Sequence, residues 1–459
     1  MMAKQKKQRV SPSSQKLKRD LLLISVTFLV AKLALIFIIK FGGWLGSDAE
    51  GYIKGAAALL KDGFFSKQDV LSYLPAGYPI LIWILSLITG TAAFITQASS
   101  LVIISIFQTL VYFVACAFFV EKIRATRLRT LALPTAVLLG INPTLSLSSL
   151  VVGYESLVAS CMLLSVALVI DYQTKTKQKS LVRTLILVGL LQSLAGIMQP
   201  RILLVGIGLI ILWACFQQSR KSMAVVLLVG FGMTSVLPLA LVFRNYQATG
   251  SAVLSTQLGI TMSAGAGDKA TGGFTGSLYI HCPPKSPPVV ASDSDLVKCV
   301  LDWYRQHPTQ TIRLIINKTI FFWSPWSGPL ANGTMGRNPW LKMSPMRVIG
   351  STPSRHGYIY GGLGLVISWI WLLAGLVLLF LGFGWLWKLG GLERQISLLM
   401  AVPIVLATLT SVGTIGDHRY RVPTMGLSLF LQVAGFFALK GRFPMVPTAP
   451  ALEPKGRAR

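Results

Sequence analysis

Long apolar segments, separated by short polar connections, run through most of this chain. The first of them, residues 21–39, is interrupted only by Lys32. A segment of this length can cross the hydrocarbon core of a bilayer as a helix. Hydrophobic residues make up 53% of the chain and charged residues only 13%, which leaves too little polar surface to cover a soluble fold. We therefore predict an all-α polytopic membrane protein, in which Lys32 faces neighbouring helices or reaches toward the interface.

The residues in front of the first apolar segment form a basic tail, residues 1–20. A basic tail followed by an apolar run is also the pattern of a cleaved signal peptide. The run is long, however, and no small-residue cleavage site follows it, which favours an uncleaved first span with the tail in the cytoplasm. The chain carries no endoplasmic-reticulum retention signal at Arg459, which favours a bacterial inner (plasma) membrane.

The net charge of +28 indicates orientation in the membrane rather than nucleic-acid binding, because most Lys and Arg residues lie in short connections between apolar runs. These basic connections fall on one side only if residues 80–95 do not cross. We therefore predict that residues 80–95 form a juxtamembrane or re-entrant helix on the outer face. Ten crossings remain, with both termini inside: residues 21–39, 101–120, 131–150, 156–170, 185–198, 202–216, 223–243, 359–385, 396–412 and 423–439.

A long outer region, residues 244–356, is too polar and too rich in Gly and Pro to cross the membrane. Within it, residues 295–320 are predicted to form one helix whose apolar end lies on the membrane surface. The same region contains Cys282 and Cys299, which an oxidising compartment would allow to form a disulfide. The other three cysteines lie in apolar spans and are interpreted as buried side chains.

The predicted topology places most of the rare acidic and basic side chains of the spans on the outer side. Three carboxylates occur there, Asp48 and Glu50 after the first span and Glu155 at a turn between two spans. A buried carboxylate is costly unless it has a partner, so Glu155 is either functional or a structurally paired helix cap. Four arginines also lie at span ends, where they either bind a lipid phosphate or anchor the protein to phospholipid head groups: Arg201, Arg244, Arg419 and Arg421.

The order of these residues resembles that of the GT-C glycosyltransferases, in particular protein O-mannosyltransferases and the aminoarabinose transferases of lipid A. The likeness extends over residues 21–439. It is carried by the following motifs: Ser47-Asp48-Ala49-Glu50-Gly51-Tyr52, Pro75-Ala76-Gly77-Tyr78-Pro79, Asn142-Pro143, Tyr154-Glu155, Gln199-Pro200-Arg201, Arg244-Asn245-Tyr246 with Gly250, Leu254-Ser255-Thr256, and Arg419-Tyr420-Arg421-Val422-Pro423.

The resemblance implies a sugar transferase that uses a polyprenyl-phosphate-linked donor on the outer face of the membrane. By position, Asp48 is the expected catalytic base, and Glu155 helps to hold the acceptor or a divalent metal (Mg²⁺, Mn²⁺ or Zn²⁺). The four arginines named above would supply the positive charge that stabilises the departing phosphate. An in-line attack with a single base predicts inversion at the anomeric carbon. Further candidates for this site are Glu50, Tyr52, Tyr154 and His418.

This interpretation divides the chain into five parts: a cytoplasmic tail at 1–20, a GT-C-like catalytic membrane module at 21–243 with its first outer loop at 41–98, an extracytoplasmic loop region at 244–356, C-terminal membrane helices at 357–440, and a cytoplasmic tail at 441–459. The sugar is left open, as is the choice among a lipid, a glycan and a protein acceptor. A transporter or flippase of a lipid-linked or anionic substrate is the alternative, but it would be expected to place polar groups near the midplane. A non-catalytic scaffold of the cell envelope would leave Asp48 and Glu155 without a task.

Overall fold

A computed structural model describes residues 12–38, 44–45, 48–92, 95, 98–174, 181–273, 280, 292–323 and 362–441 of the chain. In this part of the chain, eight helices are long and apolar enough to cross a membrane. Their bounds are as follows: α1 (Pro12–Phe37), α5 (Ala98–Arg124), α8 (Glu155–Thr174), α9 (Leu181–Met198), α11 (Arg220–Thr249), α16 (Gly362–Leu389), α17 (Gly391–Gly413) and α18 (Val422–Leu439). The protein is therefore an all-α, multi-pass membrane protein.

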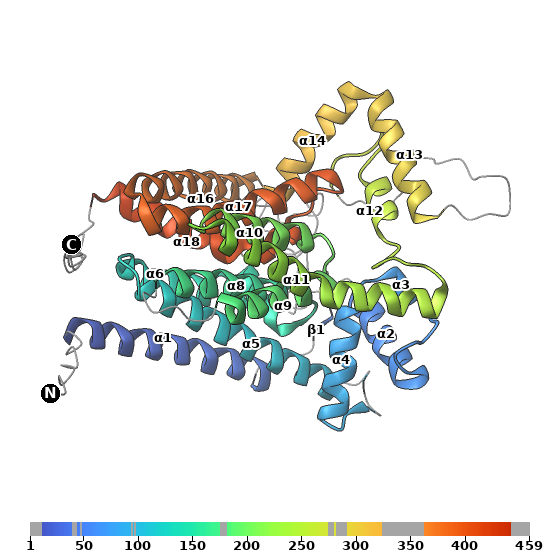
Figure 1. Cartoon of the computed structure of the whole chain (residues 1–459), viewed down its shortest axis with the longest axis horizontal. Helices are drawn as coiled ribbons and strands as arrows, with labels where there is room; N and C mark the ends of the chain where they lie inside the picture. The colour runs from blue at the N-terminus through green and yellow to red at the C-terminus, as the bar shows by residue number, and fades with distance from the viewer. Residues whose placement is uncertain are drawn as a thin grey trace, which may run out of the picture.

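Two further segments of the bundle correspond to the remaining predicted crossings. Helix α6 (Arg129–Ile141) is followed, after a bend of 59°, by α7 (Pro143–Leu147) and the 3₁₀ turn η2 (Ser148–Leu150), and together they count as a possible ninth span. The bend falls at Asn142-Pro143, where proline cannot continue the hydrogen-bond ladder. Helix α10 (Ile202–Cys215) is shorter than a full span and lies alongside α17 within the bundle (Figure 1).

The end of the bundle opposite the start of α1 and the end of α18 carries shorter helices that do not run along the spans (Figure 1). Helices α2 (Ala49–Asp62), α3 (Val70–Tyr73) and α4 (Gly77–Ile88) follow the first span, and α12 (Leu258–Ala264) follows α11. Helix α4 is apolar but has only 12 residues and runs across the end of the bundle (Figure 1). This agrees with the prediction of a juxtamembrane helix at residues 80–95.

The prediction of one helix over residues 295–320 is wrong in one respect, because the structure has two. Helix α13 (Asp293–Gln306) ends at His307, and α14 (Pro308–Trp323) starts at the next residue. Pro308 has no N–H to donate into the preceding turn, so the chain changes direction there. The exposed isoleucines Ile312, Ile316 and Ile320 recur at helical spacing along α14, but contact with a membrane surface stays a prediction.

Helices α8 and α18 form the centre of the bundle, since most of each is buried inside the protein. Helix α16 packs closely on α18 through two glycines. A methyl group added at Gly382 would collide with the carbonyl oxygen of Leu431, and one added at Gly435 would collide with that of Leu378. Small residues allow this approach of two backbones, as is common between membrane helices. Lys32 of α1 points inward as predicted, and its Nζ donates a hydrogen bond of 3.0 Å to Ser149 Oγ.

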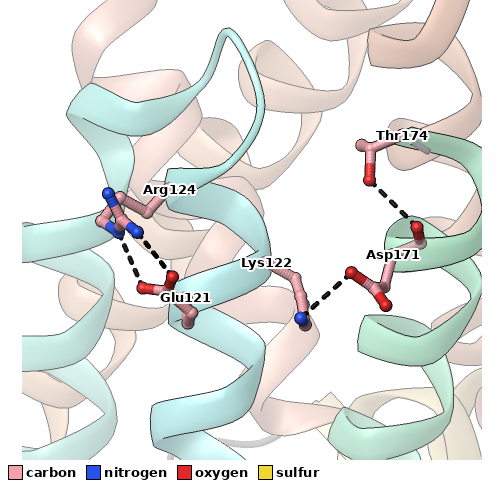
Figure 2. A network of polar contacts seen from close by, with 5 residues as sticks. All are labelled: Glu121, Lys122, Arg124, Asp171 and Thr174. Atoms are coloured by element: carbon pink, nitrogen blue, oxygen red, sulfur yellow. Dashed lines mark hydrogen bonds and ion pairs between the residues drawn. The ribbon is translucent and has the colours of Figure 1, made fainter. Parts of the chain in front are cut away.

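An ion pair joins α5 to α8 at the end of the bundle opposite the short helices. Lys122 Nζ lies 3.0 Å from Asp171 Oδ1, and the neighbouring Arg124 is paired to Glu121 (Figure 2). The hydroxyl of Thr174 donates to the main-chain oxygen of Asp171 and completes the last turn of α8. Because Asp171 is buried, its partner Lys122 compensates a charge that would otherwise be costly at this depth.

Candidate active site

Arg419 joins the two carboxylates that the sequence analysis selected. Its Nη1 lies 2.6 Å from Asp48 Oδ2, and its Nε lies 2.5 Å from Glu155 Oε1. The side chain of Glu155 is 2% exposed, whereas that of Asp48 is 32% exposed. The structure therefore brings together one buried carboxylate, one accessible carboxylate and a guanidinium between them. The remaining oxygen of the accessible carboxylate, Asp48 Oδ1, has no hydrogen bond to any described residue.

Backbone pairing places the two carboxylates side by side. Strand β1 (Trp44–Leu45) pairs in parallel with β2 (Val151–Val152), so the residues following each strand emerge at the same point. Asp48 lies directly before α2, and Glu155 is the first residue of α8. Gly153 leaves room for the second of these side chains, because a methyl group there would collide with Glu155 Oε2.

The arginine is presented by a 3₁₀ turn, η7 (His418–Arg421), which precedes α18. The carboxylate of Asp417 accepts a hydrogen bond of 2.9 Å from the main-chain N–H of Arg419 and caps this turn. Gly416 is also held in place, since its N–H donates to Gly272 O at 2.8 Å. The turn that carries Arg419 is thus fixed on both sides of Asp417.

Three buried tyrosines pack beneath the ion pairs. The rings of Tyr52 and Tyr78 are 5.0 Å apart, those of Tyr52 and Tyr154 are 6.1 Å apart, and Arg419 lies 5.2 Å from the centre of the Tyr154 ring. Burial raises the pKa of both Tyr52 and Tyr154 well above the ordinary value. Both phenols therefore stay neutral at physiological pH, and neither supplies a base. Tyr52 and Tyr154 line the pocket beside Asp48 and Arg419, and their part in a reaction stays a prediction.

A small pocket opens beside Asp48 and Arg419. It is also lined by residues of the turn between α9 and α10, of the segment that leads into α12, and of α12 itself: Gln199, Arg201, Ser255, Gln257 and Thr261. Arg201 stacks on the ring of Tyr420, with its guanidinium carbon 3.8 Å from the ring centre. The pocket thus has a carboxylate, two guanidinium groups and several neutral polar side chains around one space, which suits a ligand with both an anionic group and hydroxyls.

Arg244 lies elsewhere and has other partners. The sequence analysis predicts that Arg244 is the first residue of the long outer region. In the structure, α11 instead continues past Arg244 to Thr249 and ends where Gly250 adopts a φ of 73°. The guanidinium of Arg244 is fully buried and donates to the main-chain oxygens of Phe64 and Ser66 and to Asn245 Oδ1. These contacts fasten the end of α11 to the loop that follows α2. Its role in phosphate binding stays a prediction, and the contacts favour a structural one.

The remaining predicted site residues either lie outside the lining of the pocket or fall outside the described residues. Arg421 donates to Trp323 O at 3.1 Å and lies against that indole ring, outside the lining of the pocket. Glu50 is exposed in the first turn of α2, also outside the lining. The side chain of His418 and the whole of Cys282 lie outside the described residues, so the Cys282–Cys299 disulfide stays a prediction.

The residues described here do not fit a metal centre well. No group of three His, Cys, Asp or Glu side chains that could hold an ion occurs among them. Arg419 also occupies the position between Asp48 and Glu155 that a bridging cation would take. Metal dependence therefore stays a prediction. It would be supported if a chelator abolished activity and one added metal restored it.

Known structures of similar shape are oligosaccharyltransferases. The archaeal oligosaccharyltransferase AglB from Archaeoglobus fulgidus, in complex with an inhibitory peptide and a dolichol-phosphate, superposes with a TM-score of 0.48 at 10% identity. The apo form of the Archaeoglobus fulgidus oligosaccharyltransferase gives a TM-score of 0.47 at 13% identity. In both cases the likeness covers 90% of this chain and 50% of the other, so this chain spans about half the length of those proteins. No model of a known protein family matches the chain, and no curated protein is similar to it at a significant level.

Sequence reasoning did not select two residues that the structure places at or near the pocket. Gln199 was noted as part of a motif but was not assigned a role, although it lines the pocket next to Arg201. Lys318 of α14 is 1% exposed, and its Nζ donates to Tyr304 Oη at 2.6 Å and to Thr414 O at 2.7 Å. A lysine in an otherwise apolar stretch of a polar loop was the only signal, and it does not indicate which elements meet there.

Proposed function

We propose that the protein is a membrane glycosyltransferase that moves a sugar from a polyprenyl-phosphate-linked donor to a lipid, glycan or protein acceptor on the extracytoplasmic face. The observation that supports this most directly is the grouping of Asp48, Arg201 and Arg419 around one pocket at the outer end of the bundle. These three residues are far apart in the sequence. A transfer from a lipid phosphate needs a base on one side of the anomeric carbon and positive charge on the other.

In the proposed reaction, Asp48 takes the proton from the acceptor hydroxyl or other nucleophilic group. The acceptor atom forms a bond to the anomeric carbon of the sugar while the bond from that carbon to the phosphate oxygen breaks. The electron pair of the broken bond remains with the polyprenyl phosphate, whose negative charge Arg201 stabilises. A phosphate leaves readily, so no separate general acid is required. Because attack and departure are in line, the product has the inverted anomeric configuration.

Arg419 positions the base in this scheme. It holds one oxygen of Asp48 and is itself anchored by the buried Glu155, so that Asp48 Oδ1 remains directed to the acceptor. Held this way, the carboxylate loses little rotamer freedom when a substrate binds. Glu155 thus acts through Arg419, as a positioning residue rather than as a second base.

The donor transfer is tested with labelled polyprenyl-phosphate sugars, among them mannose, arabinose, aminoarabinose and N-acetylglucosamine. Membranes that contain the wild-type chain are compared with membranes that contain Asp48→Asn, which removes the base and hardly changes the volume. We expect transfer from one donor by the wild type and a loss of at least about a hundredfold in Asp48→Asn, the usual contribution of a general base.

The matched control is Asp69→Asn, an exposed aspartate between α2 and α3 whose side chain caps no helix. It should transfer at the wild-type rate. If Asp48→Asn transfers as fast as the wild type, Asp48 is not the base. If no polyprenyl-phosphate sugar reacts with the wild type, the proposal fails and transport of a lipid-linked or anionic substrate becomes the better explanation of the pocket.

A further inference from the structure

Two polar atoms in the pocket wall are buried and have no hydrogen-bond partner among the residues that the structure describes. They are Oε1 of Gln199 and Nη1 of Arg201, and both residues line the pocket. The side chain of Gln199 is well buried, since the residue is only 5% exposed. A buried acceptor or donor without a partner costs free energy, and folded proteins leave few such groups. Those that do occur at a pocket wall are expected to meet a ligand.

Main-chain hydrogen bonds hold the turn that carries Gln199 and Arg201 in place, although Gln199 Oε1 and Arg201 Nη1 lack hydrogen-bond partners among the described residues. The N–H of Gln199 completes the last turn of α9 by donating to Ala195 O, and the N–H of Ile202 donates to Gln199 O to begin α10, both at 2.9 Å. Pro200 stands between the two side chains and limits the backbone of the turn. Tyr420 fixes the guanidinium plane of Arg201 from one side. Both residues are therefore held in fixed positions in the pocket wall.

The spacing of the two groups restricts the chemistry of the ligand. Arg201 Nη1 requires an acceptor and favours an anionic one, while Gln199 Oε1 requires a hydrogen-bond donor. The two residues flank a single proline, so the acceptor and the donor of the ligand must lie close together. In a sugar joined to a lipid phosphate, the polar group nearest the phosphate is the substituent on the carbon next to the anomeric carbon.

We propose that Gln199 recognises the donor sugar by accepting a hydrogen bond from the hydroxyl or N–H on the carbon next to the anomeric carbon, while Arg201 contacts the attached phosphate. This inference rests on the function proposed above. Under this proposal, Gln199 is a specificity-determining residue that recognises the sugar of the donor and makes no contact with its lipid. Ser255, Gln257 and Thr261, which also line the pocket, are neutral hydroxyl and amide side chains of the kind that bind further sugar hydroxyls.

The experiment uses the purified full-length chain in lipid nanodiscs with three probes. They are undecaprenyl phosphate without a sugar, the undecaprenyl-phosphate sugar that reacts fastest in the panel above, and the 2-deoxy form of that donor. The variants are Gln199→Leu and Arg201→Gln, with Gln217→Leu as the control. Gln217 follows α10 at the opposite end of that helix, where its Nε2 donates to Trp213 O. Gln199→Met replaces Gln199→Leu if the latter does not fold.

We expect the wild type to lose about tenfold in kcat/KM on the 2-deoxy donor, which corresponds to about 1.4 kcal/mol. Gln199→Leu should react equally fast with both donors, because the contact that distinguishes them is gone. Its affinity for undecaprenyl phosphate should equal that of the wild type and of Gln217→Leu, whereas Arg201→Gln should bind this lipid at least about tenfold more weakly.

Two results would overturn the assignment of Gln199. One is a Gln199→Leu chain that still discriminates between the two donors as strongly as the wild type. The other is a loss of affinity for the sugar-free lipid in Gln199→Leu as large as that in Arg201→Gln, since Gln199 would then not read the sugar. Neither result touches the proposed function, which fails separately if the wild type transfers no sugar from any donor.

Discussion

Arg419 is the residue on which the geometry of the candidate site depends. It compensates the buried charge of Glu155 and holds Asp48 at the same time. We expect Arg419→Gln to lower the free energy of unfolding by about 3–5 kcal/mol, because it leaves a buried carboxylate without a partner. Thermal unfolding in detergent measures the change. The exposed Arg220 provides the control, and Arg220→Gln should unfold like the wild type.

The double variant Arg419→Gln/Glu155→Gln separates stability from activity. It should recover most of the lost stability, since both members of the buried pair are then neutral. Its sugar transfer should remain absent, because Asp48 is no longer held. An Arg419→Gln chain that unfolds at the wild-type temperature would contradict the role of Arg419 as the partner of Glu155.

Because Lys318 is buried, we expect the free energy of unfolding to depend on pH. Burial, together with the nearby charge of Arg201, lowers its pKa from 10.5 to about 8. Between these values the unfolded chain holds a proton that the folded chain has released, so the stability contributed by this site rises as the pH rises from about 8 to 10.5. At about 1.4 kcal/mol per pKa unit, the gain is at most about 3.5 kcal/mol.

The measurement compares thermal unfolding of the wild type and Lys318→Met between pH 7 and pH 10.5, because the contributions of all other groups cancel in the difference. Tyr304, which accepts from Lys318, stays neutral over this range, since burial raises its pKa to about 12. The wild type should gain stability relative to Lys318→Met as the pH rises. A constant difference between the two chains would show that Lys318 releases its proton at an ordinary pKa.

At the scale of the elements, the crossing of α16 and α18 is the most sensitive contact in the bundle. A methyl group at Gly435 meets the carbonyl oxygen of Leu378, which belongs to a helix backbone and cannot move aside. We expect Gly435→Ala to lower the free energy of unfolding by about 1–3 kcal/mol, the usual cost of overpacking.

Gly384 of α16 is the matched control, because a methyl group there meets no atom within 4 Å. Gly384→Ala should unfold at or above the wild-type temperature, since alanine is the better helix former. Equal effects of the two substitutions would mean that the backbones of α16 and α18 do not approach as closely as described.

At the scale of the whole molecule, the first residues of α1 and the last of α18 lie at the same end of the bundle (Figure 1). The candidate site lies at the other end. The distribution of basic residues predicts that the first of these ends is cytoplasmic. Single cysteines introduced at the exposed positions Asp69 and Arg220 show on which side of the membrane each end of the bundle lies. They require a background in which the free cysteines Cys116, Cys161 and Cys215 are replaced.

A membrane-impermeant maleimide added to intact cells should label Asp69→Cys and leave Arg220→Cys unlabelled until the cells are permeabilised. Each position is charged and exposed in the wild type, so the substitution should not disturb the fold. Labelling of Arg220→Cys in intact cells would reverse the orientation and place the candidate site in the cytoplasm. Such a result would exclude a donor presented on the outer face.

The sequence alone determined the class of the protein and the identity of its carboxylates. Apolar length is a local property, and it was sufficient to predict the long apolar helices of the described residues. That α4 does not cross the membrane, inferred from the placement of basic residues, stays a prediction. Asp48 and Glu155 could be selected because an acidic residue next to a membrane span is rare. Arg244 shows the limit, since its position at a span end gave no sign that α11 continues to Thr249 and buries its guanidinium.

Only the tertiary structure decided which of these groups meet. Arg419 pairs with Asp48 and Glu155 because β1 lies beside β2 and because η7 is presented at the same end of the bundle, and both are contacts between distant parts of the chain. The orphaned atoms of Gln199 and Arg201 likewise exist only as a property of the packed turn. The length of the apolar segments determines which of them enter the membrane. How these segments meet is determined by side-chain packing and hydrogen bonding between them, which depend on residues far apart in the sequence.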